Sequence, residues 1–184
     1  MRLAEGSLRD RLREGTRVEH ERLDGGLDLT AGGLTAGRYR QVLERFHGFW
    51  AGWEPRLAAE LRDEALFGPR RRLHLLREDL RALGADPEGL PLCPPPPIRG
   101  HAEAMGSLYV MEGSTLGGRV ILKRLEGLGL PAGSCGYFAG HGARTGAMWT
   151  AFLGRLEAEP DTAAVLRGAR ATFATLGDWV LQAA

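Results

Sequence analysis

Apolar residues recur at helical spacing along most of the chain, and this pattern constrains the fold more than any other feature. It is clearest after Thr35, where a broad apolar face runs through Tyr39, Trp53 and Leu61. No segment shows the alternation of a half-buried strand, and no internal repeat is visible. The sequence therefore predicts an all-α fold, a single-domain multi-helix bundle that covers residues 1–184.

Caps and helix breakers place the helices. Ser7 with Asp10 resembles a capping box, and Gly25-Gly26 interrupt the pattern that follows. Prolines exclude a helix over residues 86–100, which should form a proline-rich surface connector. The expected helices cover residues 7–24, 35–67, 70–83, 101–126, 144–158 and 161–182.

Charge and composition exclude several classes of partner. Basic and acidic residues number 24 and 23, and neither half of the chain holds a long run of one sign, so we expect no nucleic-acid partner. The chain starts without an apolar signal core and has no stretch approaching about 18 apolar residues. We therefore expect no membrane span and a cytoplasmic location.

Glycine is unusually frequent, with 27 residues, and several glycines fall inside the expected helix 101–126. Each interior glycine costs about 1 kcal/mol relative to alanine, so their presence needs a reason. On an ideal helix Gly106, Gly113 and Gly117 lie within about 40° of one another and form a strip of bare backbone. One interpretation is a small-residue seam for close helix packing. The other is a flat ligand against the strip, with a kink at Gly117-Gly118.

His20, in the first expected helix, can supply an axial ligand to a flat group that carries a metal. It lies one turn after Thr16 on the half-buried side, and Asp24 at i+4 can accept the second ring N–H and fix the tautomer. Arg13 lies two turns earlier, about 10.5 Å along the same face, where it can reach an acidic group at the ligand's edge. The alternatives are a packed or capping histidine and a solvated arginine.

Two segments resemble the heme oxygenase family, in its bacterial branch. They are residues 16–23 around His20 and residues 109–118, YVMEGSTLGG. The likeness is greatest to the enzymes found beside bacterial phytochromes. It extends to residues 149–153 and 171–173 near the C-terminus.

The resemblance implies an all-α fold that holds heme between the helix of His20, the proximal ligand to iron, and the glycine-rich distal helix 101–126. Heme b is then both cofactor and substrate. The family uses oxygen to cleave the porphyrin ring to biliverdin, carbon monoxide and ferrous iron. Electrons come from a ferredoxin or a flavoprotein reductase, and a bacterial phytochrome is the implied acceptor of the bilin chromophore.

For this chain, the resemblance assigns catalysis to Gly113, Ser114 and Gly117. Bare backbone at the two glycines lets the distal helix come close to the heme, and Ser114 with a water network would deliver protons. Ser114 stands where the animal enzymes carry an aspartate, so the proton relay should differ. The implied heme-binding residues are His20, Arg13, Asp24, Tyr109, Gly113, Gly117, Gly118 and Phe173.

A second departure concerns the heme propionates. Relatives often place basic residues on the late helix where this chain has Gly146 and Thr150. Propionate anchoring then falls to Arg13. Weaker candidates are Lys123, Arg144 and Tyr109.

Several other signals have simpler explanations. Cys93-Pro94 matches a short heme-responsive motif, but an exposed proline-rich loop explains it. The arginines at 70–72 are expected to form a solvated helix start, and Phe173 is either core or pocket wall. We expect a core position for Phe46, Phe49, Trp50 and Trp53, and a surface or structural one for His47, His74, His101 and His141.

Two other functions remain open at this point. A non-catalytic carrier or sensor of heme or bilin on the same fold would keep His20 without needing an oxygen-activating distal face. A relative acting on another small molecule, such as the thiaminase-like or ferritin-like helical proteins, would need clustered carboxylates or a nucleophilic cysteine. Glu112 alone does not supply such a cluster.

Overall fold

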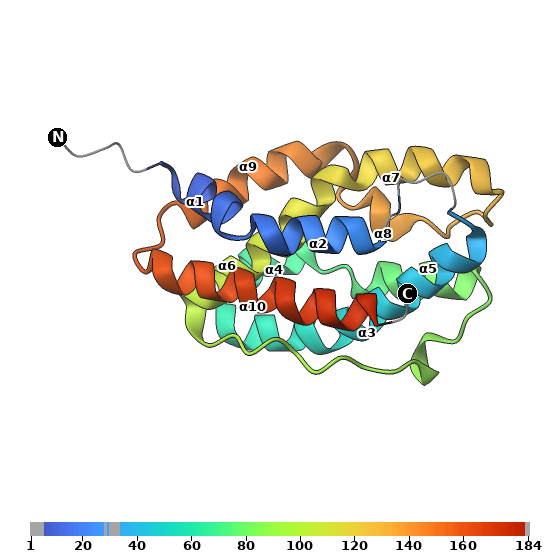
Figure 1. The fold of residues 1–184 in the computed structure, drawn as a ribbon, viewed down its shortest axis with the longest axis horizontal. Helices are drawn as coiled ribbons and strands as arrows, with labels where there is room; N and C mark the ends of the chain where they lie inside the picture. Colours follow the sequence, from blue (N-terminus) through green and yellow to red (C-terminus); the bar gives the residue numbers. More distant parts are fainter. Residues whose placement is uncertain (1–5, 28, 30–33, 183–184) are drawn as a thin grey trace.

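The computed structural model describes residues 6–27, 29 and 34–182, and these form helices joined by turns and loops, with no β-strand among them (Figure 1). The all-α prediction is confirmed. The α-helices are α1 (Leu8–Gly15), α2 (Arg17–Leu27), α3 (Ala36–Leu61), α4 (Glu64–Phe67), α5 (Leu73–Ala82), α6 (Gly100–Gly113), α7 (Gly118–Leu125), α8 (Gly136–Ala139), α9 (Thr145–Leu156) and α10 (Thr162–Leu181). Short 3₁₀ turns are η1 (Gly68–Arg70), η2 (Pro87–Gly89), η3 (Ser114–Gly117), η4 (Glu126–Leu128) and η5 (Gly142–Arg144).

The first expected helix, 7–24, is two helices in the structure. The Ser7 side chain caps α1 by accepting a backbone hydrogen bond, as predicted. α1 ends at Gly15 and is followed by Thr16, whose hydroxyl donates to the Leu12 carbonyl at 2.8 Å. A threonine that bonds back to its own helix competes with the backbone ladder, and this competition accounts for the interruption before α2.

The predicted break at Gly25-Gly26 is wrong, because α2 continues through both glycines to Leu27. Leu27 is buried, and the Leu181 side chain of α10 packs against Gly26. Tertiary packing here outweighs the low helix propensity of glycine.

α3 carries the aromatic core. Phe46, Phe49, Trp50 and Trp53 are all buried, as predicted. The Trp50 indole donates to the hydroxyl of Tyr137 at 3.0 Å, so the polar edge of this ring is satisfied inside the core. The expected helix 35–67 is divided between α3 and α4, which are separated by a left-handed residue at position 62.

α6 and α10 cross with their backbones in contact. A Cβ at Gly106 would lie 1.8 Å from the Val165 carbonyl oxygen, and one at Gly168 would lie 1.9 Å from the Glu103 carbonyl oxygen. No side chain fits at either position. The small-residue seam is therefore the correct explanation for Gly106.

The proline-rich segment 86–100 runs beside α3 without regular structure except for η2 and Gly100, the first residue of α6 (Figure 1). The Cys93 N–H donates to the Gly48 carbonyl at 3.0 Å, and Cys93 and Ile98 are buried. A Cβ at Gly52 would meet the Cys93 carbonyl at 2.5 Å. The prediction that Cys93 lies in an exposed loop is wrong, because this part of the connector packs tightly on α3.

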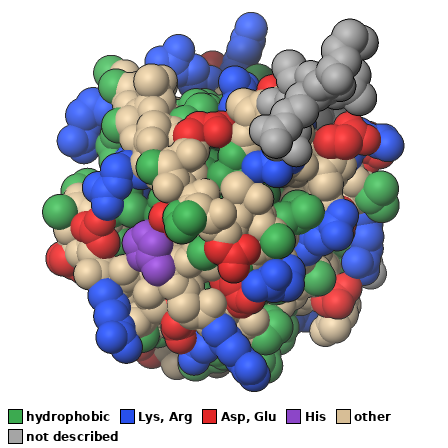
Figure 2. Space-filling view, turned by 90° about the vertical axis from the view of Figure 1, so that its left-hand side faces the viewer, with side chains coloured by type: hydrophobic (Ala, Val, Ile, Leu, Met, Phe, Trp, Pro, Cys, Tyr) green, Lys and Arg blue, Asp and Glu red, His purple; other side chains and the backbone are tan. Residues whose placement is uncertain are grey.

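The outer surface follows the balanced composition. The face in Figure 2 mixes Lys and Arg with Asp and Glu. In the part of the chain that the structure describes, no helix has the combined length and apolar character needed to cross a membrane.

Candidate functional site

The glycine-rich segment is bent, and the bend is a 3₁₀ turn between α6 and α7. The Ser114 hydroxyl donates to the Met111 carbonyl at 2.7 Å, and the Thr115 hydroxyl donates to the Glu112 carbonyl at 2.6 Å. Arg72 adds a third donor, from Nη2 to the Met111 carbonyl at 2.8 Å. Side-chain donors on these carbonyls disturb the regular helix ladder, so they account for the bend together with the glycines. The interruption begins at Ser114, before the predicted Gly117-Gly118 kink.

At and around the bend, the backbone is open on one face. A Cβ at Gly117 would meet nothing within 4 Å, and one at Gly113 would only touch Trp149 at 3.7 Å. Leu116 and Val120 are large apolar residues that remain exposed. Positions 113, 116, 117 and 120 have the spacing of a single helix face. The distal segment thus offers an apolar face with bare backbone, which suits a flat apolar ligand.

His20 is exposed at a position where its neighbours are buried. Leu12, Thr16, Leu23 and Leu27 form the inward stripe of α1 and α2 and are at most 9% exposed. His20 falls within this stripe by helical spacing, yet its side chain is 59% exposed. The imidazole is therefore presented to open space at an inward-facing position.

The ring of His20 is held on two sides. Nδ1 lies 3.1 Å from an Asp24 carboxylate oxygen, the contact that the i+4 spacing predicted. The ring packs edge-on against Phe173 of α10, with centroids 5.7 Å apart. A carboxylate on Nδ1 favours the tautomer in which Nε2 carries the lone pair, so Nε2 is the nitrogen suited to bind a metal.

α10 also fixes the helices on which His20 lies. Arg170 Nε donates to the Gly15 carbonyl at 2.8 Å, across the interruption between α1 and α2. Arg22 pairs with Asp178 at 2.9 Å. These contacts lie on either side of His20 along the chain, so α10 sets the position of the imidazole.

A phenol and two arginines lie at one side of this region. Burial raises the pKa of Tyr109, and the positive charges of Arg9 and Arg13 act on it in the opposite direction. The ring of Tyr109 packs on Trp149, with centroids 5.6 Å apart, and Trp149 is the neighbour of Gly113. The structure thus brings Arg13 of α1 within electrostatic range of the distal helix.

Other predicted residues lie elsewhere or have another neighbour. A Cβ at Gly118 would lie 2.3 Å from the Phe138 carbonyl oxygen, so close packing of α7 on α8 explains this glycine. Lys123 and Arg144 are exposed on α7 and η5. Phe173 is buried and touches His20, so it is both core and neighbour of the site.

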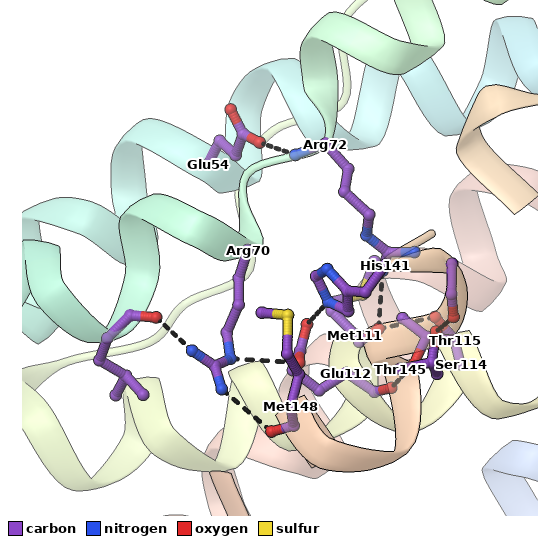
Figure 3. Close-up of polar contacts among 12 residues, drawn as sticks. Glu54, Arg70, Arg72, Met111, Glu112, Ser114, Thr115, His141, Thr145 and Met148 are labelled. Carbon is purple, nitrogen blue, oxygen red and sulfur yellow. Dashed lines mark hydrogen bonds and ion pairs between the residues drawn. The ribbon is translucent and has the colours of Figure 1, made fainter. Parts of the chain in front are cut away.

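A buried polar network behind the bend was not predicted (Figure 3). Glu112 accepts from Arg70 Nε at 3.1 Å and lies 3.1 Å from His141 Nε2, and all three side chains are buried. Arg70 and Arg72 are 6% and 3% exposed, so the prediction of a solvated helix start at 70–72 is wrong. α5 instead begins at Leu73. Arg70 and Arg72 look solvated in the sequence because their partners, Glu112 and the Met111 carbonyl, are 42 and 39 positions away.

The chain is similar in sequence to a known protein over part of its length. No family model matches the chain. Over 102 residues, the chain is 44% identical to a heme oxygenase of Xanthomonas campestris pv. campestris (strain 8004). That match covers 53% of this chain and 59% of the relative, so the chain spans less than two thirds of the curated protein it matches.

Two solved structures are similar over almost the whole chain. One is the NO- and CO-bound heme oxygenase from Neisseria meningitidis, with a TM-score of 0.76 and 23% identity over 97% of this chain and 92% of that chain. The other is the heme oxygenase from Leptospira interrogans, with a TM-score of 0.73 and 20% identity over 96% of this chain and 100% of that chain. This chain therefore has the fold of these two proteins.

Proposed function

We propose that the chain is a heme oxygenase, which uses oxygen to cleave the porphyrin ring of heme to biliverdin, carbon monoxide and ferrous iron. The observation that carries this proposal is the exposed His20 imidazole within a buried stripe, with Asp24 on Nδ1 and Phe173 beside the ring. The named relatives and the shared fold support the same activity. We further propose that residues 1–184 act as one domain.

The residues present fit heme b as substrate and cofactor. Nε2 of His20 would bind the iron, and Gly113 and Gly117 would allow the distal backbone to come close to the ring. Arg13 and Tyr109 would hold the propionates, since one supplies positive charge and the other a hydroxyl donor. When bound, the heme supplies the iron that activates oxygen.

Ser114, at the bend of the distal segment, would take part in supplying protons to the reaction. The Ser114 hydroxyl donates to the Met111 carbonyl, so its oxygen can accept a hydrogen bond from water and hold a proton donor beside Gly113. Ser114 is exposed, which leaves it accessible to such water. We propose this arrangement in place of the aspartate of the animal enzymes.

Hemin binding and turnover test the proposal. Purified protein is titrated with hemin, the Soret band is recorded, and reductant and oxygen are then supplied with catalase present. We expect loss of the Soret band and growth of biliverdin absorbance, and we expect His20→Ala to lose nearly all turnover. His101→Ala is the matched control, because His101 lies at the far end of α6 beside Glu159.

Two outcomes would contradict the proposal. A stable ferric or oxy complex under reducing, aerobic conditions would instead support the heme or bilin carrier or sensor. No Soret shift in the wild type would contradict both heme functions. Equal losses in His20→Ala and His101→Ala would show that the effect is not specific to the proposed ligand.

We also propose a cellular role, on the likeness of the 109–118 motif to the enzymes found beside bacterial phytochromes. In this role a ferredoxin or a flavoprotein reductase in the cytoplasm supplies electrons, and the biliverdin passes to a phytochrome as chromophore. Mixing the reaction product with an apo-phytochrome tests this step. Failure of the phytochrome to form a bilin adduct would count against it.

A further inference from the structure

A small cavity behind the bend of the distal segment is strongly cationic. Its volume is 210 Å³, and its lining includes Arg71, Arg72, Arg144, His74 and His141 but no Asp or Glu among the described residues. A concave site lined by cations and lacking carboxylates favours an anion.

Arg72 is the buried member of this lining, at 3% exposure. Its Nη2 donates to the Met111 carbonyl, but its Nε is buried and has no hydrogen-bond partner in the part of the chain that the structure describes. The guanidinium packs over the rings of Trp50 and Tyr137, at 4.9 and 5.0 Å, rather than against a carboxylate. A buried charge with an unsatisfied donor is unfavourable unless an anion or another acceptor satisfies it.

The other basic side chains differ in whether a carboxylate already contacts them. Arg71 pairs with Glu64 at 2.8 Å, and His141 contacts Glu112. Arg144 is exposed and forms no ion pair with any described residue. Arg72 and Arg144 therefore supply the positive charge that remains for a ligand.

The start of α5 also reaches the cavity, but a carboxylate already occupies this helix start. His74 and Leu75 line the cavity from the first turn of this ten-residue helix. Glu54 accepts from the N–H groups of Arg72 and Leu73, and no side chain caps the helix from position 72. The Glu54 carboxylate therefore already offsets the positive end of the α5 dipole, and the positive potential of the cavity comes from its arginines.

We propose that this cavity binds a small oxyanion of the size and charge of inorganic phosphate, with Arg72 Nε as the buried donor and Arg144 at the rim. The inference goes beyond the proposed function, because it concerns the protein without heme. Its position gives the anion a link to the bend, since Arg72 also donates to Met111 and His141 contacts Glu112.

Binding of inorganic phosphate to the heme-free, full-length protein tests the proposal. Calorimetric and thermal-unfolding titrations with sodium phosphate are compared with sodium chloride at the same ionic strength and pH. We expect a saturable heat of binding and a rise in Tm that chloride does not reproduce. Arg144→Gln should weaken phosphate binding by about tenfold, the effect of losing one charge-assisted hydrogen bond.

Arg119→Gln is the matched control, because it removes the same charge from an exposed position on α7 outside the cavity. It should bind phosphate like the wild type. Arg72→Met should abolish phosphate binding. If this variant does not fold, the phosphate affinity of Arg144→Gln tests the proposal instead.

Three results would overturn the proposal. The first is a phosphate response no larger than that of chloride, and the second is an equal loss of binding in Arg119→Gln and Arg144→Gln. The third is tighter binding of succinate than of phosphate, which would assign the cavity to a carboxylate instead. Because heme is absent throughout, none of these results depends on the heme oxygenase activity.

Discussion

The two halves of the distal segment use the same residue for opposite purposes. Gly106 lies before the bend, where the backbone of α10 leaves no room for a methyl group. Gly117 ends the 3₁₀ turn, with nothing within 4 Å of the place where a Cβ would stand. One glycine allows two helices to touch, and the other leaves space unfilled. A strip of glycines on one helix face is therefore not a single surface, since what packs against it can change along its length.

Gly106→Ala should produce the largest effect, because the new Cβ would meet backbone atoms at 1.8 and 2.7 Å. Backbone cannot move aside as a flexible side chain can, so the α6–α10 crossing must separate. We expect a loss of at least about 3 kcal/mol in the free energy of unfolding, measured by urea denaturation. A loss below about 1 kcal/mol would show that Gly106 is not more tightly packed than Gly117 and would contradict the comparison.

Gly118→Ala should be intermediate. Its Cβ would lie 2.3 Å from the Phe138 carbonyl oxygen, but the next nearest atom is 3.4 Å away. α8 is a single short turn that can shift, and alanine restores some helix propensity, so we expect a loss of about 1 to 2 kcal/mol by the same measurement. A loss as large as that of Gly106→Ala would show that α8 is as fixed as α10.

Gly117→Ala should change stability less than Gly106→Ala or Gly118→Ala, and in the opposite direction. Open space and ordinary helical dihedral angles (φ −77°, ψ −14°) allow alanine, which should stabilise the protein by about 0.5 to 1 kcal/mol. If heme lies against this face, the same change should slow biliverdin formation.

Gly113→Ala is the companion variant, with a nearly unchanged free energy of unfolding because Trp149 is 3.7 Å away. Normal turnover in both folded variants would contradict the placement of heme.

Local patterns in the sequence predicted the parts of the site that depend on one helix. The pairing of His20 with Asp24 follows from i+4 spacing, and the aromatic face of α3 follows from its periodicity. The glycine strip was recognisable for the same reason. Its division into a packed half and an open half was not, because that depends on where α10 crosses.

Residues whose partners are distant in the sequence were predicted poorly. Arg70 is 42 positions from Glu112, and nothing near Arg70 indicates a buried partner. Cys93 looked exposed because prolines surround it, yet its N–H bonds to Gly48 of α3. In both cases a local signal of solvent exposure is overruled by a contact that only the folded chain provides.

The crossing of α6 and α10 sets the relative position of the two sides of the proposed heme site. On one side of the proposed heme site, Phe173 and Arg170 of α10 contact the helices that position His20, and on the other side α6 itself ends at Gly113. Because main chain packs against main chain at this crossing, side-chain substitutions there can change the separation between the His20 and Gly113 helices very little. Any adjustment to a thicker or thinner ligand is left to the two interrupted helices, at Thr16 and at the 3₁₀ turn that starts at Ser114.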